Sequence, residues 1–269
     1  SNGRVENDDE EERHTMLIRP TDDGTFECIY QEHHGLLSGV LAGAWTRTRL
    51  DPLLVQAIGL HDNPWRGADA RVLFNEDTGL PHDFMTYPHG PKFDFYRAGI
   101  DELERVDPFV AYLVSRHYTT FAGTRNADAL TAPEEERRLR LSGMLSVAQH
   151  EELDEALSWT KFFDVFSLYL CLTGPRSRPE DIPSWLLPAG GWTTAPDFTE
   201  LTLDWLDDET LSVSPWPFAT PELSARIYFR LLGERVTNTL ELESQWSAAE
   251  QGVRDIVLLP TRGERRTPS

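Results

Sequence analysis

Through the first two thirds of the chain, apolar residues recur every three or four positions, which is the spacing of one helix face. Leu37, Leu41 and Ala44 share such a face in a helix that we expect to begin near residue 32. Asp51-Pro52 predicts a second helix, because aspartate is a favoured N-cap and proline suits the first helical position. Further helices are expected at about 93–105, from 108 onward and at about 151–173, with a solvated helix or loop at 132–140.

Shorter apolar segments with strand-like alternation lie near the two ends of the chain. Met16–Arg19 and Thr25–Tyr30 flank a polar turn and predict a pair of strands. An antiparallel sheet is predicted after residue 174 from the segments Leu201–Trp205, Leu211–Val213, Ala225–Leu231, Asn238–Glu243 and Val253–Leu259. Because two strands alone are marginally stable, we expect the N-terminal pair to join this sheet. The polar stretch from Asn63 to Pro91 predicts a long loop, and loops of that length are often functional.

These elements predict an α+β protein with four parts. Residues 16–174 hold the N-terminal strands and a helical core, and residues 175–262 form a β-rich region that packs on this core. Residues 1–15, which include carboxylates at every position from 8 to 12, are expected to be a disordered acidic tail. Residues 263–269 are expected to be a second disordered tail.

The net charge of the chain limits the classes of partner that it is expected to bind. Its 269 residues include 45 acidic and 25 basic side chains, which give a net charge of −20. Such an acidic surface argues against nucleic acid or an anionic membrane as the main partner. It does not exclude a small anionic substrate that binds in a local basic pocket. No signal peptide or membrane-spanning apolar run is visible, so a cytoplasmic protein is expected. Cys28 and Cys171 lie in apolar segments and are expected to be core residues.

Histidines and aspartates occupy corresponding places on the predicted helices. His34 and His117 continue apolar helix faces, and Asp164 interrupts a strongly apolar segment. His61-Asp62 ends the second helix, where the chain turns and both side chains can reach one point. Neutral imidazoles and carboxylates that converge from rigid elements suit divalent transition metals. The sequence therefore predicts one or two ions of Fe, Mn, Ni, Co or Zn, with the ligands His34, His61, Asp62, His89, His117 and Asp164.

Each of these residues also has a structural explanation. A histidine at a helix C-terminus is favoured by the helix dipole, and a buried histidine is often simply hydrogen-bonded. A buried Asp164 needs a partner, a proton or a cation, and Lys161, one turn earlier, is the competing partner. His89 lies in the predicted loop, where His82 is its rival. His33 is expected to be more exposed than His34.

The order His34, His61-Asp62 and Asp164 resembles the order of ligands in the HD superfamily of metal-dependent phosphohydrolases. Most of residues 16–262 are also similar to an uncharacterised prokaryotic family, domain of unknown function thirty-eight ninety-one. The segments that carry this likeness are Gln31–Gly39, Thr78–Pro81, Leu113–His117, Asp164–Cys171 and Pro215–Phe218. The resemblance implies an HD-like all-helical core bundle, accompanied by an antiparallel sheet from the C-terminal region and the N-terminal strands.

Three functions follow from this set of residues. The first is an HD-type phosphohydrolase acting on a small phosphorylated metabolite or nucleotide, in which a metal would lower the pKa of bound water. Its catalytic candidates are Asp62, Arg116, which suits a phosphate, and Lys161. The second is a mixed-valent diiron oxygenase similar to myo-inositol oxygenase, which the additional His89 and His117 would suit. The third is a metal-free HD-like protein that binds a ligand or a partner.

Overall fold

The computed structural model describes residues 16–66, 72–120, 127–178, 182, 186 and 192–261. The first half of the described chain contains β1 (Met16–Pro20), β2 (Phe26–Tyr30), α1 (Gln31–Ala44), α2 (Pro52–Gly59), the 3-10 helix η1 (Asn63–Trp65), β3 (Phe74–Asn75), β4 (Leu80–Pro81), α3 (His89–Glu104) and α4 (Pro108–Thr119). The second half contains α5 (Ala127–Ser142), α6 (Val147–Leu172), β5 (Trp192–Thr194), β6 (Glu200–Trp205), β7 (Thr210–Ser214), β8 (Leu223–Leu232), α7 (Thr239–Ala248) and β9 (Gln251–Pro260). The tails predicted at 1–15 and 263–269 lie outside the described residues.

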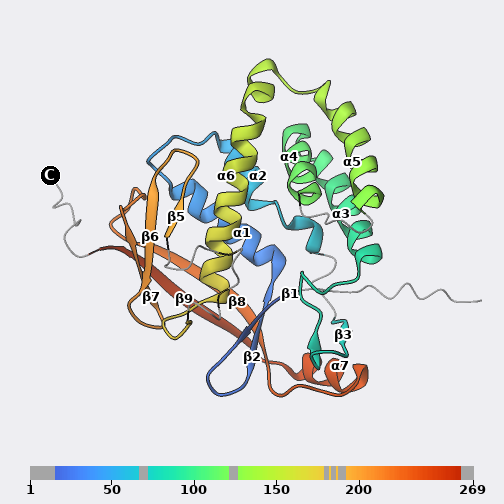
Figure 1. Cartoon of the computed structure of the whole chain (residues 1–269), viewed down its shortest axis with the longest axis vertical. Coiled ribbons are helices and arrows are strands. Elements are labelled where there is room, and N and C mark those ends of the chain that lie inside the picture. Colours follow the sequence, from blue (N-terminus) through green and yellow to red (C-terminus); the bar gives the residue numbers. More distant parts are fainter. Residues whose placement is uncertain are drawn as a thin grey trace, which may run out of the picture.

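One large sheet organises the molecule (Figure 1). Its seven strands follow the order β1-β2-β8-β9-β7-β6-β5 and curl into a half-barrel. Every neighbouring pair is antiparallel except β7 and β9, which are parallel. The N-terminal strands belong to this sheet through β2, in which Cys28 lies opposite Arg230 of β8. Residues of β6 and β8 alternate between buried and exposed positions, so one face of these strands points to solvent.

The predicted HD-like all-helical core bundle with an antiparallel sheet beside it is wrong. The sheet is mixed, it is the largest element of the fold, and α1 packs against β8 while α6 packs against β1. The larger of two apolar clusters therefore joins sheet residues such as Leu17 and Ile29 to helix residues such as Leu41 and Phe163. An apolar helix face does not reveal whether its partner is a helix or a sheet, because both present the same hydrocarbon surface.

Two local predictions also need correction. Asn238–Glu243, predicted as a strand, begins α7, because the Asn238 side chain accepts a hydrogen bond from the amide of Glu241 at 3.0 Å and caps a helix. The predicted loop from Asn63 to Pro91 instead contains η1, the β3–β4 pair and the first residues of α3. Short polar elements of this kind have no apolar period that would distinguish them from a loop.

Helices α1 and α2 cross at very close range because each has a glycine at the crossing. A Cβ atom added to Gly39 would lie 2.7 Å from the Cα atom of Gly59. Likewise, a Cβ atom added to Gly99 of α3 would overlap Pro64 of η1. These contacts bring the backbones of α1, α2, η1 and α3 close together around the end of α2.

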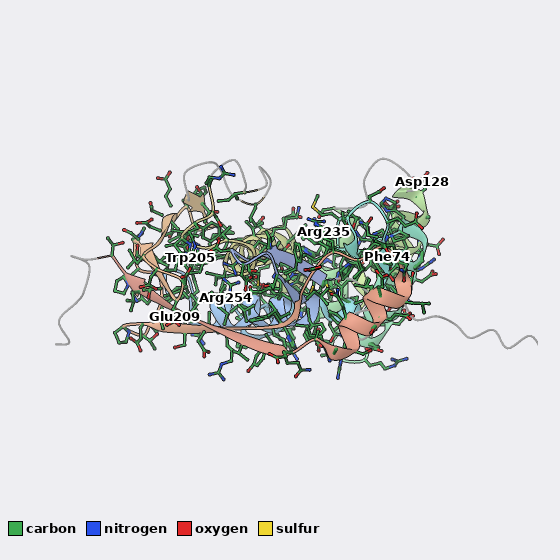
Figure 2. All side chains as sticks on the ribbon, turned by 90° about the horizontal axis from the view of Figure 1, so that it is seen from below. Phe74, Asp128, Trp205, Glu209, Arg235 and Arg254 are labelled. Carbon is green, nitrogen blue, oxygen red and sulfur yellow. The ribbon has the colours of Figure 1, made fainter. Side chains whose placement is uncertain are left out.

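The remaining helices complete one end of the molecule. Figure 1 shows α3, α4 and α5 grouped on the side of α6 away from β5, β6 and β7. In the view turned by 90°, Trp205 and Glu209 lie at one end of the molecule, and Phe74 and Asp128 lie at the other (Figure 2).

Cys28 and Cys171 are both buried, as expected from their apolar segments. Among the described residues, no helix has the length and apolar character needed to span a membrane.

Candidate metal centre

Five buried side chains from four helical segments converge at one place in the core. His34 comes from α1, His61 and Asp62 follow the end of α2, His117 comes from α4, and Asp164 comes from α6. The three imidazole side chains are at most 3% exposed, whereas the two aspartate side chains are each 9% exposed. All five residues are therefore buried, and the carboxylates are slightly more accessible than the imidazoles.

The end of α2 allows two adjacent residues to reach the same point. The helix finishes at Gly59, and the chain then turns into η1 through Leu60. His61 and Asp62 lie in this turn, where the regular rotation between neighbouring helical residues no longer separates them. Gly35 of α1 faces the turn, and a Cβ atom there would lie 3.3 Å from Cβ of Asp62. The small residue lets Asp62 approach α1.

The distances between nitrogen and oxygen atoms in the cluster are short. Nε2 of His34 and Nε2 of His61 lie 3.0 Å and 3.4 Å from Oδ1 of Asp164, and Nε2 of His117 lies 3.4 Å from its Oδ2. Oδ2 of Asp62 lies 3.5 Å from Nε2 of His34 and 3.8 Å from Nε2 of His61. Two ligand atoms about 2.1 Å from one ion are separated by roughly 3.0–3.4 Å at octahedral or tetrahedral angles. The three distances to Asp164 fall in this range, and the two from Asp62 are slightly longer. The side chains form two overlapping groups of three potential ligands that share His61.

The orientation of His61 indicates that a cation belongs in the cluster. Its Nδ1 lies 2.7 Å from the carbonyl oxygen of Ile58, which can only accept, so Nδ1 carries the hydrogen. In neutral His61 the lone pair of Nε2 then faces the oxygens of Asp62 and Asp164. Nε2 is buried and makes no hydrogen bond. Lone pairs that face one another repel, and a proton or a metal ion between them removes the repulsion.

His34 is oriented by a serine on the neighbouring helix. Oγ of Ser167 lies 2.6 Å from Nδ1 of His34, 2.7 Å from Oγ of Ser38 and 2.9 Å from the carbonyl oxygen of Asp164. When His34 donates to Ser167, the serine hydrogen goes to the carbonyl or to Ser38, and Nε2 presents its lone pair to the cluster. A partner of this kind, which fixes the ring of a metal-binding histidine, is a regular feature of metal sites.

The charges of the cluster shift the pKa values of its members in opposite directions. Burial disfavours protonated His61, but Asp62 and Asp164 outweigh it and raise the pKa of His61 to about 9. Burial lowers the pKa of His117 to about 3, against the attraction of Asp164. Burial raises the pKa of Asp62, whereas the neighbouring His34 and His61 outweigh burial and lower the pKa of Asp164. Without a metal, one proton on His61 therefore occupies the place of the cation.

An aromatic group with one cation borders Asp62. The hydroxyl of Tyr118 donates a 3.0 Å hydrogen bond to Oδ1 of Asp62, and its ring stacks on Tyr96 with centroids 3.8 Å apart. Tyr96 in turn meets the edge of Trp65. Nζ of Lys92 lies 5.7 Å and 5.8 Å from the centroids of the Trp65 and Tyr96 rings. Of this group, Lys92 carried a signal in the sequence, because the chain has only two lysines.

Three further predicted site residues have a different environment. His89 is exposed at the first position of α3, its ring lies against Phe93, and it is in neither group of potential metal ligands found among the described residues. Arg116 donates to Asp154 at 2.8 Å on the surface. Lys161 is half-buried and close enough to His117 for its charge to lower the histidine pKa. His82, the rival of His89, contacts Thr86.

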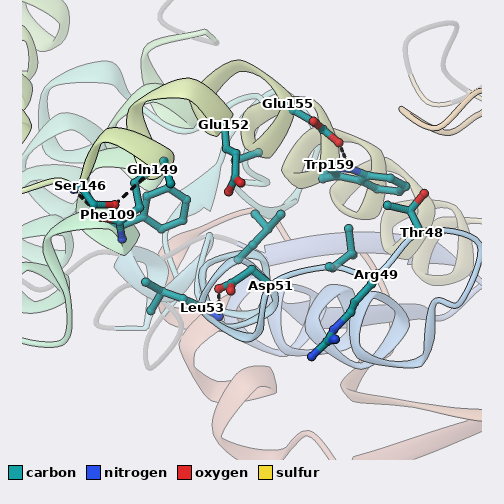
Figure 3. A pocket seen from close by; sticks show the side chains of 14 residues that line it. Thr48, Arg49, Asp51, Leu53, Phe109, Ser146, Gln149, Glu152, Glu155 and Trp159 are labelled. Carbon is teal, nitrogen blue, oxygen red and sulfur yellow. Dashed lines mark hydrogen bonds between the residues drawn. The ribbon is translucent and has the colours of Figure 1, made fainter.

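The five clustered residues line neither of two cavities found in the described structure. A cavity of about 540 Å³ lies between the start of α2 and the N-terminal half of α6, with Asp51, Glu152 and Trp159 in its wall (Figure 3). A second, of about 730 Å³, lies beyond the C-terminal end of α6, beside Glu27 and Arg254. Neither cavity contains a set of residues with the donors of a transition-metal site.

Comparison with known proteins gives a family without an assigned reaction. The family model described as "Protein of unknown function (DUF3891)" matches residues 16–234, which include all five clustered residues. No significant match was found among curated proteins or among solved structures. The family match agrees with the resemblance seen in the sequence and brings no support for membership of the HD superfamily.

Proposed function

The chain belongs to the DUF3891 family, and we propose that it is a metal-dependent phosphohydrolase acting on a small phosphorylated metabolite or nucleotide. The observation that carries the proposal is the buried Nε2 of His61, which faces two carboxylates without a hydrogen bond. Four neighbours complete a mixed nitrogen and oxygen donor set: His34, Asp62, His117 and Asp164. Such a set suits Fe, Mn, Co, Ni or Zn, and we propose that it holds one ion.

A bound divalent ion in such a site lowers the pKa of water and polarises a phosphoryl oxygen. The protein's own part is to orient the reactants and exclude other water. Asp62 and Asp164 are the more exposed members of the cluster, so we infer that the substrate approaches from their side. Oδ1 of Asp62 is held by Tyr118, which leaves Asp62 oriented to accept the proton that hydrolysis releases from water.

The order of the ligands along the chain supports hydrolysis. His34, His61-Asp62 and Asp164 resemble the HD phosphohydrolases in this order, and the proposal uses this likeness of ligands and no likeness of fold. The diiron oxygenase expected as the alternative would use His89 as a further ligand. Because His89 is exposed and outside the clustered groups, no observation favours that second reaction.

The first experiment measures metal binding by the full chain. Protein purified without chelators is analysed for metal content, then stripped and titrated with Mn²⁺, Fe²⁺, Co²⁺, Ni²⁺ and Zn²⁺ while thermal unfolding is followed. We expect close to one equivalent of metal and a higher Tm, since a ligand that binds only the folded state stabilises it. His61→Asn should abolish both effects, and the exposed His89→Gln should leave both unchanged.

The second experiment measures phosphate release from a panel of sugar phosphates, nucleotides and other phosphate esters with the metal-loaded protein. We expect release from at least one class of ester, lost in Asp164→Asn and retained in His89→Gln. If the protein binds metal but releases phosphate from none of the esters, the proposed hydrolysis is wrong and only metal binding is supported. Absence of metal binding would overturn the proposal altogether.

A further inference from the structure

The only two lysines of the chain, Lys92 and Lys161, both lie near the buried cluster. The other 23 basic residues are arginines. Lys92 lies close enough to Asp62 for the negative charge of the carboxylate to raise the pKa of Lys92. Lys161 lies close enough to His117 for its positive charge to lower the pKa of His117. A chain that otherwise uses arginine thus has one ammonium group near Asp62 and another near His117. An ammonium is a point charge with three rotating donors, which suits an anion in a narrow space.

Lys92 is held in place without being neutralised. Its Nζ donates to the carbonyl oxygen of Phe84 at 2.6 Å, and the rings of Trp65 and Tyr96 lie beside it. Aromatic faces attract a cation but leave its charge intact. Within the described structure, no carboxylate forms an ion pair with Lys92, although Asp62 and Asp83 are in its vicinity. One of its three N–H donors is used by Phe84, and the other two remain for a ligand.

Lys92 is half-buried and forms no ion pair within the described structure, so its ammonium can bind an anion that enters beside Asp62. We propose that Lys92 binds the phosphate group of the substrate at the edge of the metal centre. The inference rests on the proposed function and adds to it the residue that selects a phosphorylated substrate. It also replaces Arg116 in this role, because the guanidinium of Arg116 is paired with Asp154.

The low number of lysines makes a direct test possible. The metal-loaded full chain is treated briefly with an amine-selective acylating reagent, and modification of Lys92 and Lys161 is followed by mass spectrometry with and without inorganic phosphate. We expect phosphate to slow the modification of Lys92 at least tenfold. Lys161, on α6, is the internal reference and should be slowed less. Equal rates at Lys92 with and without saturating phosphate would overturn the inference.

A variant tests the same contact. Lys92→Met should weaken the binding of inorganic phosphate to the metal-loaded protein about tenfold to a hundredfold, the loss expected for one charge-assisted hydrogen bond. It should leave the metal content unchanged and raise KM for phosphate esters more than it lowers kcat. Arg105→Met, at the exposed far end of the same helix, removes the same charge and should have no effect. Lys92→Arg should restore part of the affinity.

The possible results separate this inference from the proposed function. If the unaltered protein binds phosphate and Lys92→Met binds it equally well, Lys92 is not the phosphate ligand, and hydrolysis can still stand. If Lys92→Met loses the metal together with phosphate, Lys92 is a structural support of Asp62, and the inference is wrong. If the unaltered metal-loaded protein neither binds phosphate nor hydrolyses any ester, the proposed function is wrong, and the inference on Lys92 is wrong with it.

Discussion

At the scale of single residues, the cluster depends on hydrogen bonds that fix which nitrogen of each ring faces inward. His61 is fixed by the carbonyl of Ile58 and His34 by the hydroxyl of Ser167. Both partners lie within the helices, so the direction of each lone pair is set before any ion arrives. This pre-orientation lets the rings present their lone pairs to an ion without first reorienting.

Ser167→Ala tests this orientation. Without the hydroxyl, the ring of His34 loses its partner at Nδ1, and metal affinity should fall about tenfold to a hundredfold. The measurement is a competition titration against a chromophoric chelator. Ser158→Ala is the matched control, because Ser158 is exposed on the same helix and its hydroxyl donates to the carbonyl of Asp154, one turn earlier, as Ser167 donates to that of Asp164. Equal affinities of the two variants would show that Ser167 does not position His34.

The stability of the metal-free protein should depend on pH through His61. Its pKa in the folded protein is about 9, above the ordinary value of 6.5, so its contribution is complete below pH 6.5 and decreases as the pH rises toward 9. The pKa of Lys92 is lowered by burial to about 8, so above pH 8 the deprotonation of Lys92 opposes this trend. The pKa of His117, which burial lowers to about 3, opposes the decrease as well, so between pH 6.5 and 8 the free energy of unfolding should fall by about 1 kcal/mol.

Urea denaturation of chelator-treated protein at several pH values checks this prediction. Addition of one equivalent of the preferred metal should remove the decrease, because the ion takes the place of the proton on His61. A free energy of unfolding that stays constant from pH 6.5 to 8 without metal would mean that His61 carries no proton in the folded state.

At the scale of elements, the site exists because α1 and α2 cross closely enough for their ends to share ligands. The N-cap Asp51 and the following proline were readable from the sequence, and so was the apolar face of each helix. The closeness of the crossing depends on Gly39 and Gly59, twenty residues apart, and their meeting is a property of the packed pair. A glycine inside a helix gives no sign by itself of what it faces.

Gly39→Ala should separate the two helices. The added Cβ atom would lie 2.7 Å from Cα of Gly59, so we expect a loss of about 1–3 kcal/mol in stability and weaker metal binding as His34 and His61 move apart. Gly43→Ala, one turn further along α1, is the control, since its Cβ atom would meet Val55 Cγ1 at 3.6 Å, an ordinary contact. Gly43→Ala should be neutral or stabilising, because alanine favours the helix by roughly 0.5–1 kcal/mol. Equal stability of the two variants in urea would contradict a tight crossing.

At the scale of the whole molecule, the strand at the centre of the sheet comes from the end of the described chain. β9 lies between β8 and β7, antiparallel to the first and parallel to the second. The family match ends at residue 234, before β9 begins at Gln251. Without β9 the sheet would divide into β1-β2-β8 and β7-β6-β5.

A chain that ends at residue 234 should therefore fail to fold cooperatively. We expect it to lack a sharp thermal transition by circular dichroism and to bind no metal, whereas a chain that ends at residue 261 keeps both. The reason is that β8 and β7 would each lose a neighbouring strand and leave backbone N–H and C=O groups unpaired. These two strands also contribute to the apolar core on which α1 and α6 pack. Cooperative unfolding of the shorter chain would show that the sheet does not need β9.

The sequence by itself determined the positions of the long helices, of most strands and of the residues that converge in the core. His34, His61, Asp62, His117 and Asp164 stand at apolar helix faces or helix ends, and these are local properties that a short window of residues sets. The tertiary structure decided what each apolar face packs on, and so placed the helices on a curled mixed sheet instead of in a bundle. It also decided that His89 remains outside and that Lys92 lies beside Asp62, because burial and charge pairing depend on neighbours distant along the chain.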